Sequence, residues 1–223
     1  MNQLNPSITR SQESVLATNK VLKNTYMLLS MTLMFSALTA FVGVQISLSP
    51  IGGLLSTLAG IGLLWFALPK TAHTSAGLGV TFAFTGLLGL GLAPTLQYYL
   101  KIPNGADIVM SAFGGTGAIF LGLSGYALTS RKNFSFMGGM LMSGMFVVML
   151  AAFAGIFLQM PGLQVAISAM VVLLMSGMIL YETSQIIHNG ETNYIYATAN
   201  LYMSILNLFT SLLQLLGIFS SDD

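Results

Sequence analysis

Long apolar segments alternate with short polar or proline-containing breaks along most of the chain. A helix needs about 20 mostly apolar residues to cross the hydrocarbon core of a bilayer. Segments of about that length fall at residues 25–47, 51–69, 74–97, 107–128, 134–158, 162–187 and 197–219. The pattern therefore predicts an all-α membrane protein with seven transmembrane helices.

The breaks between these segments are short, and Pro50, Pro69 and Pro161 mark three of them. Because no polar stretch is long enough to fold alone, we expect one seven-helix domain over residues 25–219. A polar tail over residues 1–24 precedes it, and a short tail over residues 220–223 follows it. The first tail is expected to be extended, with a short interfacial helix possible over its second half. It does not resemble a cleavable signal peptide, so the first helix is expected to be an uncleaved anchor.

Positively charged residues lie almost entirely on one side of the predicted spans. With a cytoplasmic N-terminus, the cytoplasmic side receives Arg10, Lys20, Lys23, Lys70, Arg131 and Lys132, whereas only Lys101 lies outside. Cytoplasmic loops of membrane proteins carry an excess of lysine and arginine. The distribution therefore predicts a cytoplasmic N-terminus and a C-terminus outside.

The composition supports a surface that faces lipid, since 55% of the residues are hydrophobic and only 6% are charged. Soluble domains carry about 25% charged residues. The absence of cysteine excludes disulfides and thiolate metal sites, and two histidines far apart in the sequence, His73 and His188, do not suggest a metal site. We find no nucleophile and base set and no phosphate-binding loop, so we expect no catalytic residue, no cofactor and no enzyme activity. The net charge of +1 does not favour nucleic acid as a partner.

The last predicted helix carries a stripe of polar residues at spacings of 4, 3, 4 and 3, namely Asn200, Ser204, Asn207, Ser211 and Gln214. At 100° per residue they fall within an arc of about 80°. Their polar groups would lack partners if they faced lipid. The stripe therefore faces either a water-filled cavity or neighbouring helices that it hydrogen-bonds. In both cases we expect the last helix to be central, surrounded by the other six.

Glu182 is the one ionisable side chain that the pattern leaves inside a predicted span. Such a group costs several kcal/mol in hydrocarbon, so it is a candidate functional residue. It lies about five residues from the cytoplasmic end of its helix, at a depth comparable with that of Asn200 and Ser204. We expect a carboxyl that is at least partly protonated near neutral pH and hydrogen-bonded to the stripe. Glu182 and the five stripe residues are thus candidates for proton sensing or for lining a pore, and a purely structural hydrogen-bonding role for Glu182 is the alternative.

Two segments resemble the signature of the Bax inhibitor family: YETSQII at residues 181–187 and LYMSILNLF at residues 201–209. Four further stretches resemble one bacterial branch of that family: KVLKNTY at 20–26, FAFTG at 82–86, FSFMGGMLM at 134–142 and GETNY at 190–194. The family resemblance implies a seven-helix fold around a central last helix. The branch resemblance implies a multi-pass protein of the bacterial inner membrane that binds and restrains the membrane protease FtsH, as a competing or slow substrate. A polar cytoplasmic tail would give such a protease a handle.

Some members of this family are pH-sensitive calcium leaks that use a pair of aspartates as a latch. By the resemblance, the first aspartate falls on Glu182 and the second on Ser204, which cannot ionise. The arginine that partners the latch has no counterpart, because residues 51–69 contain no basic side chain. Two carboxylates that share a proton titrate as a coupled pair, and one carboxyl cannot reproduce this. A leak for calcium ions or protons with a degenerate latch is therefore the alternative function.

Overall fold

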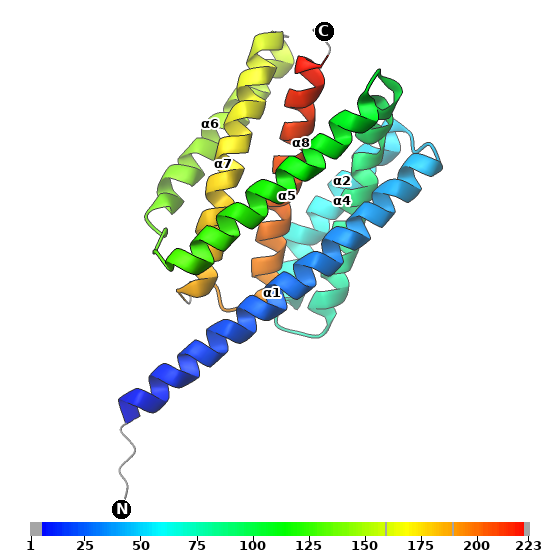
Figure 1. Cartoon of the computed structure of the whole chain (residues 1–223). Helices are drawn as coiled ribbons and strands as arrows, with labels where there is room; N and C mark the ends of the chain where they lie inside the picture. The colour runs from blue at the N-terminus through cyan, green and yellow to red at the C-terminus, as the bar shows by residue number, and fades with distance from the viewer. Residues whose placement is uncertain (1–5, 159, 189, 221–223) are drawn as a thin grey trace, which may run out of the picture.

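The computed structural model describes residues 6–158, 160–188 and 190–220. Its helices are α1 (Pro6–Gln45), α2 (Pro50–Gly62), the π-helix η1 (Leu63–Ala67), α3 (Leu68–Thr71), α4 (Ala76–Lys101), α5 (Gly105–Ser130), α6 (Met137–Leu158), α7 (Pro161–Ile187) and α8 (Tyr194–Phe219). Among the described residues, seven helices are long and apolar enough to cross a membrane, and α2, η1 and α3 together form one of them. The prediction of an all-α protein with seven membrane spans is confirmed (Figure 1).

The first helix is much longer than the first predicted span. It begins at Pro6, so residues 6–24 are helical, in contrast to the extended tail that we expected. No glycine or proline occurs between Ser7 and Val42, so the chain contains no residue that would break the helix there. Figure 1 shows the N-terminal part of α1 projecting beyond the ends of the other helices.

The second span contains one wide turn. Pro69 has no N–H to donate and its ring crowds the carbonyl four residues earlier. Immediately before it, residues 63–67 form a π-helix, and the Leu68 N–H bonds to the Leu63 carbonyl, five residues back. The wider turn lets the span continue through Pro69 without a break.

The last helix lies at the centre of the bundle, as predicted. It packs against α1, α4, α5 and α7, and its residues Leu201, Tyr202, Leu208 and Leu213 are fully buried. The expectation that six helices surround it was wrong, since α2 packs on α4 and α6 packs on α7, both on the outside. The four neighbours α1, α4, α5 and α7 already leave these four side chains with no exposed surface.

Helices α1 and α4 pack closely at a glycine. A Cβ atom at Gly89 of α4 would collide with the Ser36 carbonyl oxygen and the Thr39 hydroxyl of α1. In contrast, Ala118 and Gly122 on α5 and Gly139 and Ser143 on α6, small residues at four-residue spacing, are exposed. Small residues permit close contact, but their spacing does not show which of them face a neighbour.

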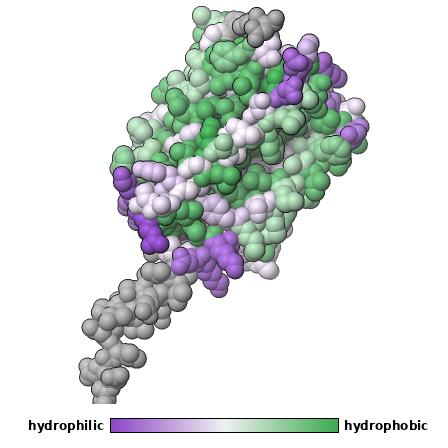
Figure 2. Space-filling view, in the orientation of Figure 1, coloured by the Kyte–Doolittle hydropathy of each residue, from purple (hydrophilic) through white to green (hydrophobic). Residues whose placement is uncertain are grey.

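The termini lie at opposite ends of the bundle (Figure 1). The end that carries Lys70 and the α5–α6 loop with Arg131 and Lys132 is called the basic end below. Gln45, Lys101 and Ser220 lie at the other end, called the C-terminal end. Figure 2 shows hydrophilic residues gathered at both ends with a broad apolar band between them, as a membrane-spanning surface requires.

Candidate functional site

Three consecutive polar residues are buried near the end of α7: Glu182, Thr183 and Ser184, which are 7%, 0% and 1% exposed. Successive helical residues point about 100° apart, so the three side chains reach different neighbours. Together they tie α7 to α8, α1, α5 and the α5–α6 loop. We call these three residues the α7 cluster.

Glu182 contacts the central helix through one hydroxyl group. The Ser204 Oγ lies 3.1 Å from Glu182 Oε1 and 3.0 Å from Oε2, and it donates to the carboxyl group. Both residues are buried. The predicted contact between Glu182 and the polar stripe is therefore present, and Ser204 makes it.

Thr183 lies between two other helices. Its Oγ1 is 3.3 Å from the Tyr26 hydroxyl of α1 and 3.4 Å from the Ser124 hydroxyl of α5. Tyr26 also packs on Phe120 of α5, with ring centroids 6.0 Å apart. A single threonine thus bridges α1 and α5 at the level of Glu182.

Ser184 holds the loop between α5 and α6. Its Oγ accepts from the Phe134 N–H at 2.9 Å and donates to the Lys132 carbonyl at 3.3 Å. His188 lies one turn later, with Nδ1 2.9 Å from the Ser184 carbonyl oxygen and Nε2 3.1 Å from the Arg131 carbonyl oxygen. These contacts fasten the basic loop to the end of α7.

The remaining stripe residues behave differently from one another. Gln214 Oε1 accepts from Ser168 Oγ of α7 at 2.8 Å, whereas Asn207 donates to the Met203 carbonyl of its own helix at 2.8 Å. Ser211 is buried. Asn200 is exposed, so the expectation that it faces Glu182 was wrong. Near the basic end the bundle no longer covers this face of α8, and an amide can there meet water or lipid headgroups.

The two hydrogen bonds between helices made by the stripe both join α8 to α7, one near each end. Ser204 and Gln214 therefore hydrogen-bond α8 to its neighbour α7, which was one of the two interpretations of the pattern. Sequence reasoning missed Thr183 and Ser184, although three adjacent polar residues inside a span cannot all share one face. That fact alone indicates that they contact several neighbours.

A seven-helix bundle closed around its last helix, with one buried acid where α7 and α8 meet, defines a polytopic membrane protein rather than a soluble helical domain. A family model described as "Inhibitor of apoptosis-promoting Bax1" matches residues 18–221. The chain belongs to this Bax inhibitor family.

Several bacterial proteins are similar to the chain over nearly its whole length. The protein named "Modulator of FtsH protease YccA" from Escherichia coli K12 is 51% identical over 216 residues, covering 97% of this chain and 98% of its own. An "Inner membrane protein YccA" from Escherichia coli O6:H1 has the same identity and coverage. An "Uncharacterized membrane protein" of Vibrio cholerae is 50% identical over 215 residues, covering 96% of each chain. The chain is thus a multi-pass protein of the bacterial inner membrane.

Proposed function

We propose that the chain is a regulator, and not an enzyme, that binds an FtsH-type membrane protease and restrains it as a competing or slowly degraded substrate. The observation that carries this proposal is the identity of 51% over 97% of the chain with a protein named as a modulator of that protease. The similarity extends over 216 residues, nearly the whole chain.

The shape of α1 supports a role as a substrate. Its N-terminal part projects from the bundle (Figure 1), and residues 6–17 precede the apolar part of the helix, which begins at Thr18. This segment is the terminal part of a 40-residue helix, and helix ends fray. A protease that pulls on residues 6–17 therefore has little helix to unwind before it meets the bundle.

The bundle itself would resist further extraction. α1 packs closely along α4, where Gly89 leaves no space for a Cβ atom. It is also joined to α7 through Tyr26 and Thr183 and to α8 through the Ser36 and Tyr202 hydroxyls, 2.6 Å apart. Pulling on α1 must break these contacts together, which would make degradation slow.

Deletion of residues 2–16 tests the proposal. In membranes that contain FtsH, the shortened protein should persist while the full chain is degraded, because the protease loses its starting segment. Deletion of residues 220–223 removes a shorter polar segment from the predicted outer side and should leave the rate unchanged. Equal degradation of the full chain and the chain lacking residues 2–16 would contradict the proposed handle.

A cation leak is the second candidate, and the burial of Glu182 in the bundle favours it. The α8 stripe, however, pairs with α7 in place of lining a polar path. Calcium flux into liposomes, with Glu182→Gln as the matched variant, separates the two functions. Flux that depends on pH and is lost in Glu182→Gln would support the leak, whereas no flux at any pH would favour the regulator.

A further inference from the structure

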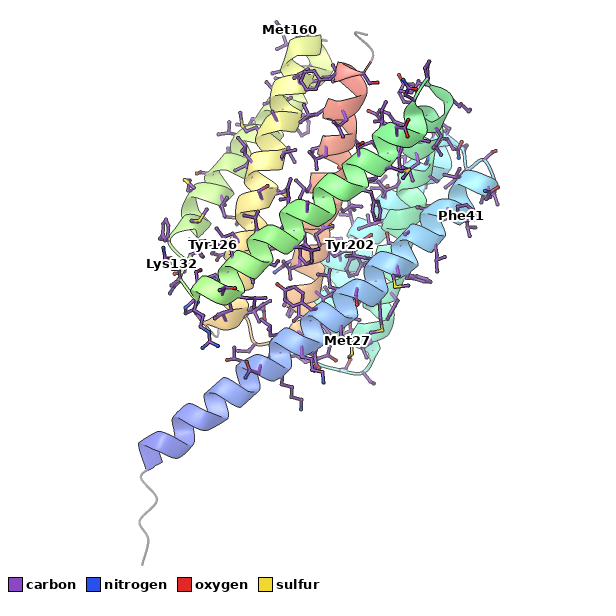
Figure 3. The ribbon with its side chains drawn as sticks, viewed as in Figure 1. Met27, Phe41, Tyr126, Lys132, Met160 and Tyr202 are labelled. Atoms are coloured by element: carbon purple, nitrogen blue, oxygen red, sulfur yellow. The ribbon has the colours of Figure 1, made fainter. Side chains whose placement is uncertain are left out.

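An apolar cavity of about 560 Å³ lies between α1 and α5, with α4 and α8 as its floor. We call it the α1–α5 groove. Its walls include Ala37 and Phe41 of α1 and Phe113 and Gly117 of α5. In Figure 3, Tyr202 lies between α1 and α5, and Phe41 lies further along α1 toward the C-terminal end.

The hydroxyl groups that line the groove already have partners within the protein. The Tyr202 hydroxyl donates to the Thr85 carbonyl at 3.1 Å, which leaves its oxygen to accept from Ser36 Oγ at 2.6 Å. Thr116 Oγ1 donates to the Ala112 carbonyl of its own helix at 2.7 Å. None of these three hydroxyl groups needs a partner in the groove, so an occupant made of hydrocarbon leaves none of them unsatisfied.

The dimensions of the groove fit one lipid chain. Its lining on α1 runs from Leu33 to Gln45, a length of about 18 Å at 1.5 Å per residue. This is close to the hydrocarbon depth of one leaflet, about 15 Å. The groove is therefore long enough to take the acyl chain of one lipid from that leaflet.

The groove ends beside a positive charge. Gln45 and Leu100 line it at the C-terminal end, and Lys101, which directly follows Leu100, is exposed. Of the seven lysine and arginine residues, Lys101 is the one that we did not assign to the cytoplasmic side. Asp107 in the first turn of α5 is the acidic residue nearest to Lys101 in sequence. Its carboxylate would attract the ammonium group of a lipid headgroup.

We propose that the α1–α5 groove binds one acyl chain of a phospholipid from the leaflet at the C-terminal end, with the lipid phosphate at Lys101. A groove that opens toward hydrocarbon within the apolar band receives lipid chains at high local concentration. The burial of the chain and the charge of Lys101 together would hold this lipid longer than the lipids around the bundle.

Gly117→Phe tests the chain site. The Cβ position at Gly117 has no heavy atom within 4 Å, so a phenyl group has room to enter the groove. Gly122→Phe is the matched control, since this position on α5 is equally open and does not line the groove. The proteins would be reconstituted in nanodiscs of phosphatidylethanolamine and phosphatidylglycerol, and retained lipids counted by native mass spectrometry.

The wild type and Gly122→Phe should each retain one phospholipid. Gly117→Phe should retain it about tenfold less often, because a few methylene groups lose their burial. Lys101→Gln changes an exposed residue. In nanodiscs that also contain diacylglycerol, which lacks phosphate, this variant should weaken retention of phospholipid but not of diacylglycerol. Equal phospholipid retention by Gly117→Phe and Gly122→Phe, or by Lys101→Gln and the wild type, would overturn the proposal.

Discussion

The Ser204 hydroxyl donates a hydrogen bond to the Glu182 carboxyl group inside the bundle, where water is not available to replace a lost hydrogen bond. A buried polar group that loses its partner costs about 1–3 kcal/mol, whereas a substitution that keeps the hydrogen-bonding atoms costs less. The two members of this pair should therefore respond differently to conservative substitutions.

Ser204→Ala should destabilise the protein by about 1–3 kcal/mol, because both carboxyl oxygens lose their donor. Glu182→Gln should cost less than about 1 kcal/mol, because an amide can still accept from Ser204. Thermal unfolding in detergent, followed by the fluorescence of the single tryptophan, Trp65, would measure both. Ser143→Ala is the control, since Ser143 is exposed and bonds only to its own helix. A stability of Ser204→Ala equal to that of Ser143→Ala would refute this role.

Ser184 should control the mobility of the basic loop. Its hydroxyl accepts from the Phe134 N–H and donates to the Lys132 carbonyl, so Ser184→Ala should speed hydrogen exchange over residues 131–136. Exchange measured by mass spectrometry should change in this segment and not in the α4–α5 loop at the other end of the bundle. The same control, Ser143→Ala, should leave the loop unchanged, and identical exchange in the two variants would exclude the anchoring contact.

At the scale of helices, hydropathy was sufficient to locate seven spans because a bilayer requires nearly continuous apolar segments. The polar stripe also gave the correct direction for Ser204 and Ser211. The same stripe predicted burial of Asn200, which is exposed. Asn200 lies on the same face of α8 as Ser204 but closer to the end of the helix. The 3.6-residue period predicts the face of the helix on which a residue lies. It does not predict how far the neighbouring helices cover that face along its length.

The contact between α1 and α4 gives the sharpest test at this scale. Gly89→Ala must push α1 away from α4, because the new Cβ atom would meet the Ser36 backbone, and forced overpacking typically costs about 1–3 kcal/mol. Gly79→Ala in the same helix has open space and should be neutral or slightly stabilising, since alanine is the better helix former. Unfolding midpoints of the two variants in detergent would show the difference. Equal midpoints would mean that α1 and α4 do not pack as closely as described.

For the whole molecule, the sequence predicted a central α8 but not which helices would cover it. Helix pairing depends on contacts such as Gly144 with Leu174 and Gly177 with Leu141, which hold α6 on the outer side of α7. Those contacts involve particular side-chain shapes on two helices, and hydropathy along one helix does not encode them. The long α1 was missed for a related reason, since polar composition alone does not distinguish a solvated helix from an extended tail.

The proposed restraint of an FtsH-type protease concerns the molecule as a unit, because it needs both the projecting N-terminal part of α1 and a bundle that would resist extraction. The most direct measurement is the rate at which FtsH, reconstituted in vesicles, degrades a second membrane substrate in the presence of this protein. The full chain should slow that degradation, Glu182→Gln should act like the full chain, and deletion of residues 2–16 should abolish the effect. An unchanged rate in the presence of the full chain would contradict the claim.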